Sequence, residues 1–434
     1  MSPLTTGILG IALLFLLFAT GMPIAFAMAL VGLLGYIYLG SLDGGLSILG
    51  VTFYAGGTSY TLSVIPLFVL MGQFASHSGL SHQIYRAVER WLGHWRGGLA
   101  MATVGACAGF AAISGSSVAT AATMGTVTLP EMKKYRYGLP LATGTVAAGG
   151  TLGILIPPSA PFVFYAILTE QSVGKLFIAG ILPGILLATL FMLAINIRVR
   201  LNPDVAPRSD RAPLKERITA LRGIWGILGL FLAVMGGIYT GVFTPTEAAG
   251  IGAFGAFVFS LFTRKMTWQH FAASLRLTGE TTGMIFIIVI GAYIFGYFLA
   301  VTRIPSELAD YMAGLQLSRY IILAGVVLIY TILGMFLDGW AIMVLTIPII
   351  HPLMVNLGFD PIWFSVMVVI MLEMALITPP VGVNVFIIKG ISKDVPMYTI
   401  FRGIWPFWVA MLVCLLILTI FPQIVLFLPN TMKG

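Results

Sequence analysis

The chain has 434 residues, of which 59% are hydrophobic and only 9% are charged, and its mean hydropathy is +1.02. A soluble globular domain carries about 25% charged residues, so the composition excludes that class and indicates an integral membrane protein. Apolar runs of about 20 residues recur without the alternation of a membrane barrel, which predicts an all-α polytopic fold. The formal charge of +8 fits basic loops at a membrane and gives no reason to expect nucleic-acid binding.

The first apolar segments of the chain predict three membrane spans. Residues 4–39 are long enough for two spans with a turn at 21–23, and a third covers about 62–83. The loop that follows is basic and is therefore expected in the cytoplasm, with Arg86, Arg90 and Arg96. The N-terminus is accordingly expected on the outer side.

Residues 97–130 predict a re-entrant hairpin whose tip is Ser114-Gly115-Ser116-Ser117. Basic residues flank the segment on both sides, so both of its ends are expected in the cytoplasm. Each apolar leg holds about 12 to 16 residues, or roughly 18 to 24 Å, which is short of the roughly 30 Å hydrocarbon core. We therefore expect the tip to lie near the bilayer midplane.

A proline pair, Pro157-Pro158, interrupts the next apolar segment, residues 139–168. Proline removes a backbone donor and clashes with the preceding turn, so the helix must break within the membrane. Lipid cannot solvate the freed carbonyls and amides, which need protein, water, an ion or a ligand. A span at 176–197 and a basic cytoplasmic linker at 198–222 follow, and repeat 1 is placed at residues 1–210.

Residues 223–434 repeat this order at an offset of 222 residues, which relates Pro157, Pro130, Ser116 and Pro23 to Pro379, Pro352, Asp338 and Pro245. The predicted elements are spans at 224–239 and 248–262, an interfacial amphipathic helix at 264–276, a span at 283–301, a hairpin at 319–352, a broken helix at 361–390 and a last span at 405–425. An odd number of crossings precedes the second hairpin, so it enters from the opposite side. We therefore predict two inverted repeats with about ten crossings, two re-entrant hairpins and two broken helices.

Broken helices at corresponding positions of two halves indicate the binding site of a secondary transporter. Hydroxyl and freed carbonyl oxygens suit Na⁺, and each hairpin tip, facing the broken helix of its own repeat, is expected to hold one cation. The residues assigned to these cation sites are Ser114, Gly115, Ser116, Gly149, Gly150, Gly334, Asp338, Thr378 and Pro379. Helix N-termini attract an anionic substrate, for which the candidates are Ser117, Pro158, Ser159, Arg303, Pro380 and Asn384.

Simpler structural roles stay open for several of these residues. The small residues of the first tip could permit tight helix packing, Asp338 could cap a helix, and Arg303 could snorkel to the surface. Glu373, one turn before the second break, could be the structural partner of a hairpin. The sequence shows no metal-ligand spacing, nucleophile–base pair or complete phosphate loop, so neither a cofactor, an enzymatic activity nor an ATP-driven pump is expected.

Four motifs in order resemble the large membrane subunit of the tripartite ATP-independent periplasmic (TRAP) transporters: AAISGSSVATAATMG at 111–125, GILIPPS at 153–159, GVFTPTEAAG at 241–250 and TPPVGVN at 378–384. The resemblance covers essentially the whole chain. It implies Na⁺-driven import of an organic acid anion, such as a C4-dicarboxylate or sialic acid, across the bacterial inner membrane. It also implies an elevator movement of the hairpins and broken helices against a scaffold.

The resemblance further implies two partners, a periplasmic substrate-binding protein and a small four-helix membrane subunit. No four-helix segment precedes the first motif, so we expect the small subunit on a separate chain. By motif position, the residues implicated in transport in the family fall on Ser116 or Ser117, Ser159, Asp338 and Arg303. The alternative is a stand-alone Na⁺/dicarboxylate or anion carrier of similar hairpin architecture. A channel is disfavoured because the polar residues gather at the two breaks.

Overall fold

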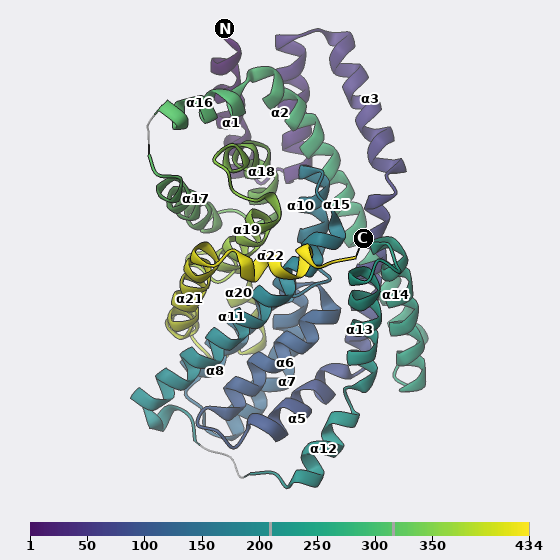
Figure 1. Cartoon of the computed structure of the whole chain (residues 1–434), viewed down its shortest axis with the longest axis vertical. Coiled ribbons are helices and arrows are strands. Elements are labelled where there is room, and N and C mark those ends of the chain that lie inside the picture. Colours follow the sequence, from purple (N-terminus) through teal and green to yellow (C-terminus); the bar gives the residue numbers. More distant parts are fainter. Residues whose placement is uncertain (208–210, 315–316, 434) are drawn as a thin grey trace.

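The computed structural model describes residues 1–207, 211–314 and 317–433 and is helical throughout, apart from its connecting segments (Figure 1). The first half contains α1 (Pro3–Ala19), α2 (Ile24–Leu39), α3 (Leu42–Thr58), α4 (Val64–His77), α5 (Leu80–Leu92), α6 (Gly98–Ser114), α7 (Ser117–Lys134), α8 (Leu139–Gly150), α9 (Leu152–Leu155), α10 (Ala160–Thr169) and α11 (Val173–Leu201). The second half contains α12 (Leu214–Arg222), α13 (Trp225–Tyr239), α14 (Pro245–Phe262), α15 (Trp268–Thr302), α16 (Ile304–Gly314), α17 (Arg319–Gly334), α18 (Gly339–Asn356), α19 (Pro361–Ala375), α20 (Val383–Ile391), α21 (Met397–Ile420) and α22 (Gln423–Asn430). This helical architecture confirms the all-α prediction.

The helices of the second half recur at the offset that relates the two proline pairs. Helices α7 and α18 begin at Ser117 and Gly339 and end at Lys134 and Asn356, so both of their bounds differ by 222 residues. Each proline pair also contains a cis peptide bond, Pro157-Pro158 in one half and Pro379-Pro380 in the other. These parallels support two related halves, whereas the inverted orientation of the repeats and their boundaries stay predictions.

Several helices of the described chain have the length and composition of membrane spans. Five of them are long and apolar enough to cross a bilayer singly, namely α11, α14, α15, α18 and α21. Two bent pairs could each form one more span: α3 with α4, which bend by 53°, and α8–α9 with α10, which bend by 44°. The chain is therefore a multi-pass membrane protein, and the exact figure of ten crossings stays a prediction.

The prediction for the third span was wrong at its C-terminal end. The sequence suggested one span over 62–83, but α4 ends at His77, and Gly79, with a φ of +74°, turns the chain into α5. Helix α5 is amphipathic and carries two of the basic residues that follow the span, Arg86 and Arg90. Helix α3 was missed because its glycines and polar side chains lower its hydropathy, although it packs against α2 and α15.

Three further segments also differ from the sequence-based prediction. The interfacial helix expected at 264–276 is the first part of the continuous α15, which starts beside the Thr267 cap and runs for 35 residues. The linker predicted at 198–222 begins inside α11 and ends in α12, and its residues 208–210 lie outside the described residues. The last span begins earlier than predicted, at Met397, and ends at Ile420.

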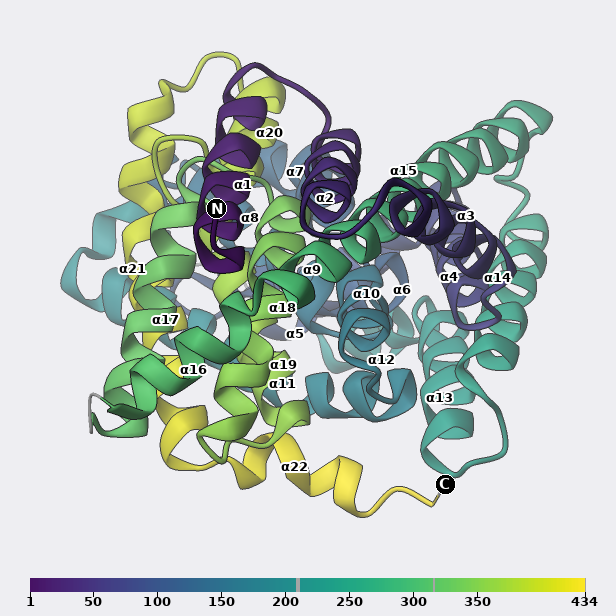
Figure 2. The ribbon, with the colours of Figure 1, turned by 90° about the horizontal axis from the view of Figure 1, so that it is seen from above.

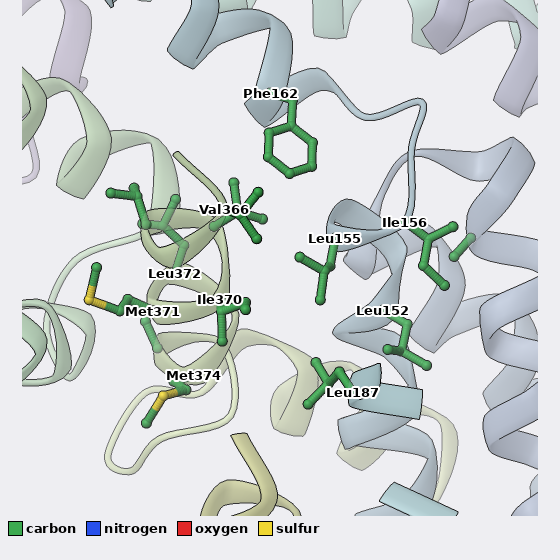
Figure 3. Packing of buried hydrophobic residues seen from close by; sticks show 14 of the residues in the cluster. Leu152, Leu155, Ile156, Phe162, Leu187, Val366, Ile370, Met371, Leu372 and Met374 are labelled. Carbon is green, nitrogen blue, oxygen red and sulfur yellow. The ribbon is translucent and has the colours of Figure 1, made fainter. Parts of the chain in front are cut away.

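Packing places the two broken helices in the middle of the protein. Seen from above, α10 of the first broken helix and α19 of the second lie between α13 and α14 at one edge and α17 and α21 at the other (Figure 2). Leu155 beside the first break faces Val366 and Ile370 of α19, whereas Ile156 lies on the other side of its turn, against Gly184 of α11 (Figure 3). These side chains are buried, and between helices inside a membrane close van der Waals packing stabilises such a contact. This apolar contact holds the two breaks close together.

Candidate functional site

The hairpin tips and the breaks meet around one cavity of about 370 Å³. Residues of α4 and α15 close one side of it, and both hairpins and both broken helices contribute to the rest. Its polar lining consists of Gln73, Ser76, Ser114, Ser116, Ser117, Thr281 and Asp338. The structure thus brings together Ser114, Gly115, Ser116, Ser117, Pro158 and Asp338 from the predicted set.

The tip of the first hairpin is seated against the first break. Gly115 ends α6 with a φ of +59°, and a Cβ atom there would lie 2.5 Å from the carbonyl oxygen of Pro158. Ser116 adopts an extended conformation, and its Oγ accepts a hydrogen bond from the backbone N–H of Ala119 at 3.3 Å. The Ser114 hydroxyl lies 2.8 Å from the Thr120 hydroxyl. Hydroxyl and carbonyl oxygens therefore gather at this tip, as a Na⁺ ligand set requires.

The first break leaves one polar group without a partner. Ser159 precedes α10, is 1% exposed, and its Oγ makes no hydrogen bond within the described chain. It lies behind the cavity wall, whereas the preceding Pro158 forms part of that wall. Gly149 and Gly150 do not line the cavity; they pack against Cys107 and Ala121, so their small size serves helix packing.

The second hairpin repeats this seating with different residues. Gly334 ends α17, and a Cβ atom there would meet the Cβ of Ala375 on α19, the broken helix of the same half. Asp338 precedes α18, and its Oδ1 accepts a hydrogen bond from the backbone N–H of Ala341 at 2.8 Å. The carboxylate thus caps the helix while it also lines the cavity. Both of the roles considered from the sequence are compatible with this position.

The polar residues of the second break point away from the cavity. The Thr378 hydroxyl donates to the carbonyl of Met374 at 2.6 Å and accepts from the Trp408 indole at 3.2 Å. The Asn384 side chain donates to the carbonyl of Ala147 at 3.2 Å, and its Oδ1 is buried without a partner within the described chain. Pro379 and Pro380 are exposed, and none of these four residues lines the cavity.

One buried contact joins the first hairpin to the second broken helix. The Ser117 hydroxyl donates to Oε1 of Glu373 at 2.5 Å, and the two residues are 3% and 0% exposed. Oε2 of Glu373 has no hydrogen-bond partner among the described residues. Glu373 is thus the partner of a hairpin, one of the roles considered from the sequence. Together with the Asn384–Ala147 bond, this contact ties polar groups of the two halves to each other.

Some lining residues were missed by the sequence reasoning. Gln73 and Ser76 on α4 and Thr281 on α15 face the cavity. Gln73 could have been found, because a polar amide inside an apolar span is a functional candidate by default. Ser76 and Thr281 gave no such signal, because hydroxyl side chains in membrane helices commonly bond to their own backbone, as Ser76 does to Gly72.

Electrostatics of the cavity come from helix ends and one carboxylate. Arg303 is exposed, ends α15 in a left-handed conformation with φ of +58°, and does not line the cavity. Among the described lining residues, Asp338 is the only charged one. The N-terminal turns of α7, α10, α18 and α20 all contribute to the lining. Helix N-termini carry partial positive charge, so the cavity can receive an anion without a basic side chain.

Comparison with known proteins decides the family. The family model for the tripartite ATP-independent periplasmic transporter, DctM component, matches residues 11–424. The chain belongs to this family. The C4-dicarboxylate TRAP transporter large permease protein DctM of Pseudomonas aeruginosa is 40% identical over 384 residues, which cover 88% of this chain and 89% of the relative. The sialic acid TRAP transporter large permease protein SiaM of Vibrio cholerae is 31% identical, with 96% and 97% covered.

Solved structures support the fold of this DctM-family permease. The Alcanivorax borkumensis YdaH transporter aligns with a TM-score of 0.64 at 14% identity, covering 88% of this chain and 89% of that chain. Neisseria gonorrhoeae MtrF aligns with a TM-score of 0.57, also at 14% identity, covering 98% and 95%. At these identities the likeness shows the fold alone. The chain is therefore a multi-pass TRAP large permease subunit with the fold of helical transporters.

Proposed function

We propose that this permease imports an organic acid anion across the bacterial inner membrane together with Na⁺. The observation that carries the proposal is the cavity at which four helix N-termini and one carboxylate converge. The names of the relatives include C4-dicarboxylate and sialic acid, and both of these compounds carry carboxylate groups. The N-terminal amides of α7, α10, α18 and α20 supply donors that suit such groups.

Charge balance favours coupling to a cation. An anionic substrate would share the cavity with the Asp338 carboxylate, without a basic side chain among the described lining residues. Buried like charges are costly unless they are paired, so cations at the hairpin tips would lower the free energy of the loaded site. The hydroxyl and carbonyl oxygens at Ser114, Gly115 and Ser116 suit Na⁺. We assign one Na⁺ to each tip, with no cofactor.

The packing supports an elevator movement of the site as one body. The hairpin tips are seated on the broken helices, and the Ser117–Glu373 and Asn384–Ala147 bonds join the two halves. Moving one of these elements alone would break buried hydrogen bonds, each loss costing about 1–3 kcal/mol. Movement of the whole group against α2, α4, α14 and α15, which pack on one another, avoids that cost. Two inverted repeats would provide the inward-facing and outward-facing states.

The proposal includes two protein partners, a periplasmic binding protein and a small membrane subunit. The test is uptake of radiolabelled succinate or sialic acid into proteoliposomes that hold this chain with both partners, with and without an inward Na⁺ gradient. We expect uptake to require Na⁺ and the binding protein and to collapse in Asp338→Ala and Ser116→Ala. Uptake that persists without the binding protein would instead favour a stand-alone Na⁺-coupled carrier. Full activity of both variants would remove the tips from the mechanism.

A further inference from the structure

A second hollow, of about 730 Å³, lies between α11 and α21 and apart from the transport cavity. Its lining forms one stripe on each helix, in which residues or neighbouring pairs recur about once per helical turn. Two arginines, Arg198 on α11 and Arg402 on α21, belong to the lining, and almost all the rest of it is apolar. We call this hollow the α11–α21 groove.

The two arginines of the groove have no acidic partner in the described part of the chain. The ion pairs found there join Arg90 with Glu89 and Glu216, Lys133 with Asp394, and Arg276 with Glu280. The described lining of the groove contains no acidic side chain. Two like charges beside one groove would be stabilised by a bound anion. Guanidinium groups match a phosphate with two parallel hydrogen bonds each.

The apolar part of the groove has the reach of one lipid leaflet. It extends from Arg198 to Leu190 on α11 and from Arg402 to Val413 on α21, or about 12 and 16 Å at 1.5 Å per residue. Half of the hydrocarbon core is about 15 Å. Leu193, Ile197 and Val409 are half exposed along this stretch, at 52%, 51% and 51%. An acyl chain that starts at the arginines would therefore cover these side chains.

The ends of the groove also fit a membrane surface. Trp405 lines the groove one turn from Arg402 and is 56% exposed, and tryptophan is enriched at the level of lipid headgroups. The basic segments at 198–222 and 389–393 flank this end, so the positive-inside rule places it at the cytoplasmic leaflet. Basic pockets between helices on that side bind anionic headgroups.

We infer that the α11–α21 groove binds one anionic phospholipid. The phosphodiester lies between Arg198 and Arg402, and one acyl chain follows Leu193 and Ile197 on α11 and Val409 and Val413 on α21. A free phosphate would satisfy the arginines alone, and an uncharged lipid would satisfy the apolar stripe alone. A zwitterionic lipid also brings a phosphodiester, but its cationic headgroup would lie beside two arginines. An anionic phospholipid matches both parts without that repulsion. Binding there joins α11 of the first half to α21 of the second.

The test uses the full chain with its small membrane subunit, purified in detergent. Bound phosphatidylglycerol is counted by native mass spectrometry during titration with that lipid, and separately with phosphatidylcholine or inorganic phosphate. We expect one tight phosphatidylglycerol that Arg198→Gln/Arg402→Gln binds at least about 10-fold more weakly, since charged hydrogen bonds are lost. The matched control Arg200→Gln/Arg222→Gln removes the same charge from exposed positions outside the groove and should keep the lipid.

A second pair of variants separates shape from charge. Val409→Trp fills the groove and should displace the lipid while both arginines remain, whereas Leu416→Trp, 58% exposed on the same helix outside the groove, should not. If both double arginine variants lost phosphatidylglycerol binding equally, the lipid would be responding to overall surface charge, and the inference would be overturned. The inference would also be overturned if phosphatidylcholine bound as tightly as phosphatidylglycerol, or if inorganic phosphate alone occupied the site. It would be overturned as well if the number of bound lipids were unchanged in Arg198→Gln/Arg402→Gln and Val409→Trp. The last outcome would be expected if the small subunit covers the groove.

Discussion

Replacement of Gly115 by alanine tests whether the seated first tip holds a coupling ion. Gly115 ends α6 in a left-handed conformation, and its Cα faces the Pro158 carbonyl. Alanine adds one methyl group and no charge, so the oxygen atoms of the tip are retained. The change therefore acts on the position of the tip and leaves its chemistry unaltered.

The size of the effect follows from two contributions of the same sign. A left-handed backbone costs an L-residue about 1–2 kcal/mol relative to its preferred conformations, which is a factor of roughly 5 to 30 in population. The added Cβ would also lie 2.5 Å from the Pro158 oxygen, a backbone atom that cannot rotate away. The seated tip therefore becomes a minor conformation, and the apparent affinity for a ligand that needs it falls by the same fraction.

The assay is substrate uptake into proteoliposomes as a function of Na⁺ concentration. We expect Gly115→Ala to raise the half-saturating Na⁺ concentration by at least about 5-fold while uptake recovers at high Na⁺. The control is Gly296→Ala on α15, where the added methyl meets no atom within 4 Å and φ is not positive. It should leave Na⁺ dependence unchanged. An unaltered Na⁺ curve for Gly115→Ala would refute the assignment of a cation to this tip.

Three further predictions concern other contacts. Asp338→Asn keeps a helix-capping oxygen, so it should unfold near the wild-type temperature but lose Na⁺-coupled uptake. Asp338→Ala should lose coupling and also about 1 kcal/mol of stability, because the cap is removed. Uptake assays and thermal unfolding distinguish the two variants. Ser117→Ala leaves Glu373 buried without its donor and should lower the free energy of unfolding by about 1–3 kcal/mol, measured by denaturant titration against Ser76→Ala, whose hydroxyl bonds only to its own helix. Lys133 donates a hydrogen bond to Asp394 and lowers the pKa of that carboxyl group below its ordinary value of 3.8. The pair therefore stabilises the folded protein above pH 3.8, and this stabilisation is lost as pH falls through the lowered pKa of Asp394. Lys133→Gln should remove this acid sensitivity from the free energy of unfolding measured as a function of pH.

Much of the fold was accessible from sequence because prolines and hydropathy act locally. The break at Pro157-Pro158 and the turn at Gly115 need only the chemistry of those residues, and the structure places both as expected. Boundaries between helices were less accessible. The turn at Gly79 and the unbroken run of α15 from Trp268 depend on how neighbouring helices pack. A hydropathy average over a short window carries no information on that packing.

The site was predictable in its elements more than in its contacts. The sequence indicated that hairpin tips and breaks meet, and Ser114, Ser116 and Asp338 do line one cavity. It did not indicate that Thr378 and Asn384 turn to Trp408 and Ala147, because those partners lie 30 and 237 residues away along the chain. Long-range pairing of this kind is fixed by tertiary packing, and so it left no spacing pattern to recognise.

For Arg303 the sequence leaves substrate binding and surface snorkelling open, and the structure adds a third observation, its place at the end of α15. Its left-handed backbone, with φ of +58°, ends α15, a position at which glycine is the least strained residue. If the cap is its role, Arg303→Gly should stabilise the protein by up to about 1 kcal/mol, and both Arg303→Gly and Arg303→Gln should transport normally. If its charge recognises the anionic substrate, both variants should raise the substrate KM by a similar factor, whatever their stability. The exposed position outside the cavity favours the first outcome, and a shared rise in KM in uptake assays would show that Arg303 approaches the substrate in another state of the transport cycle.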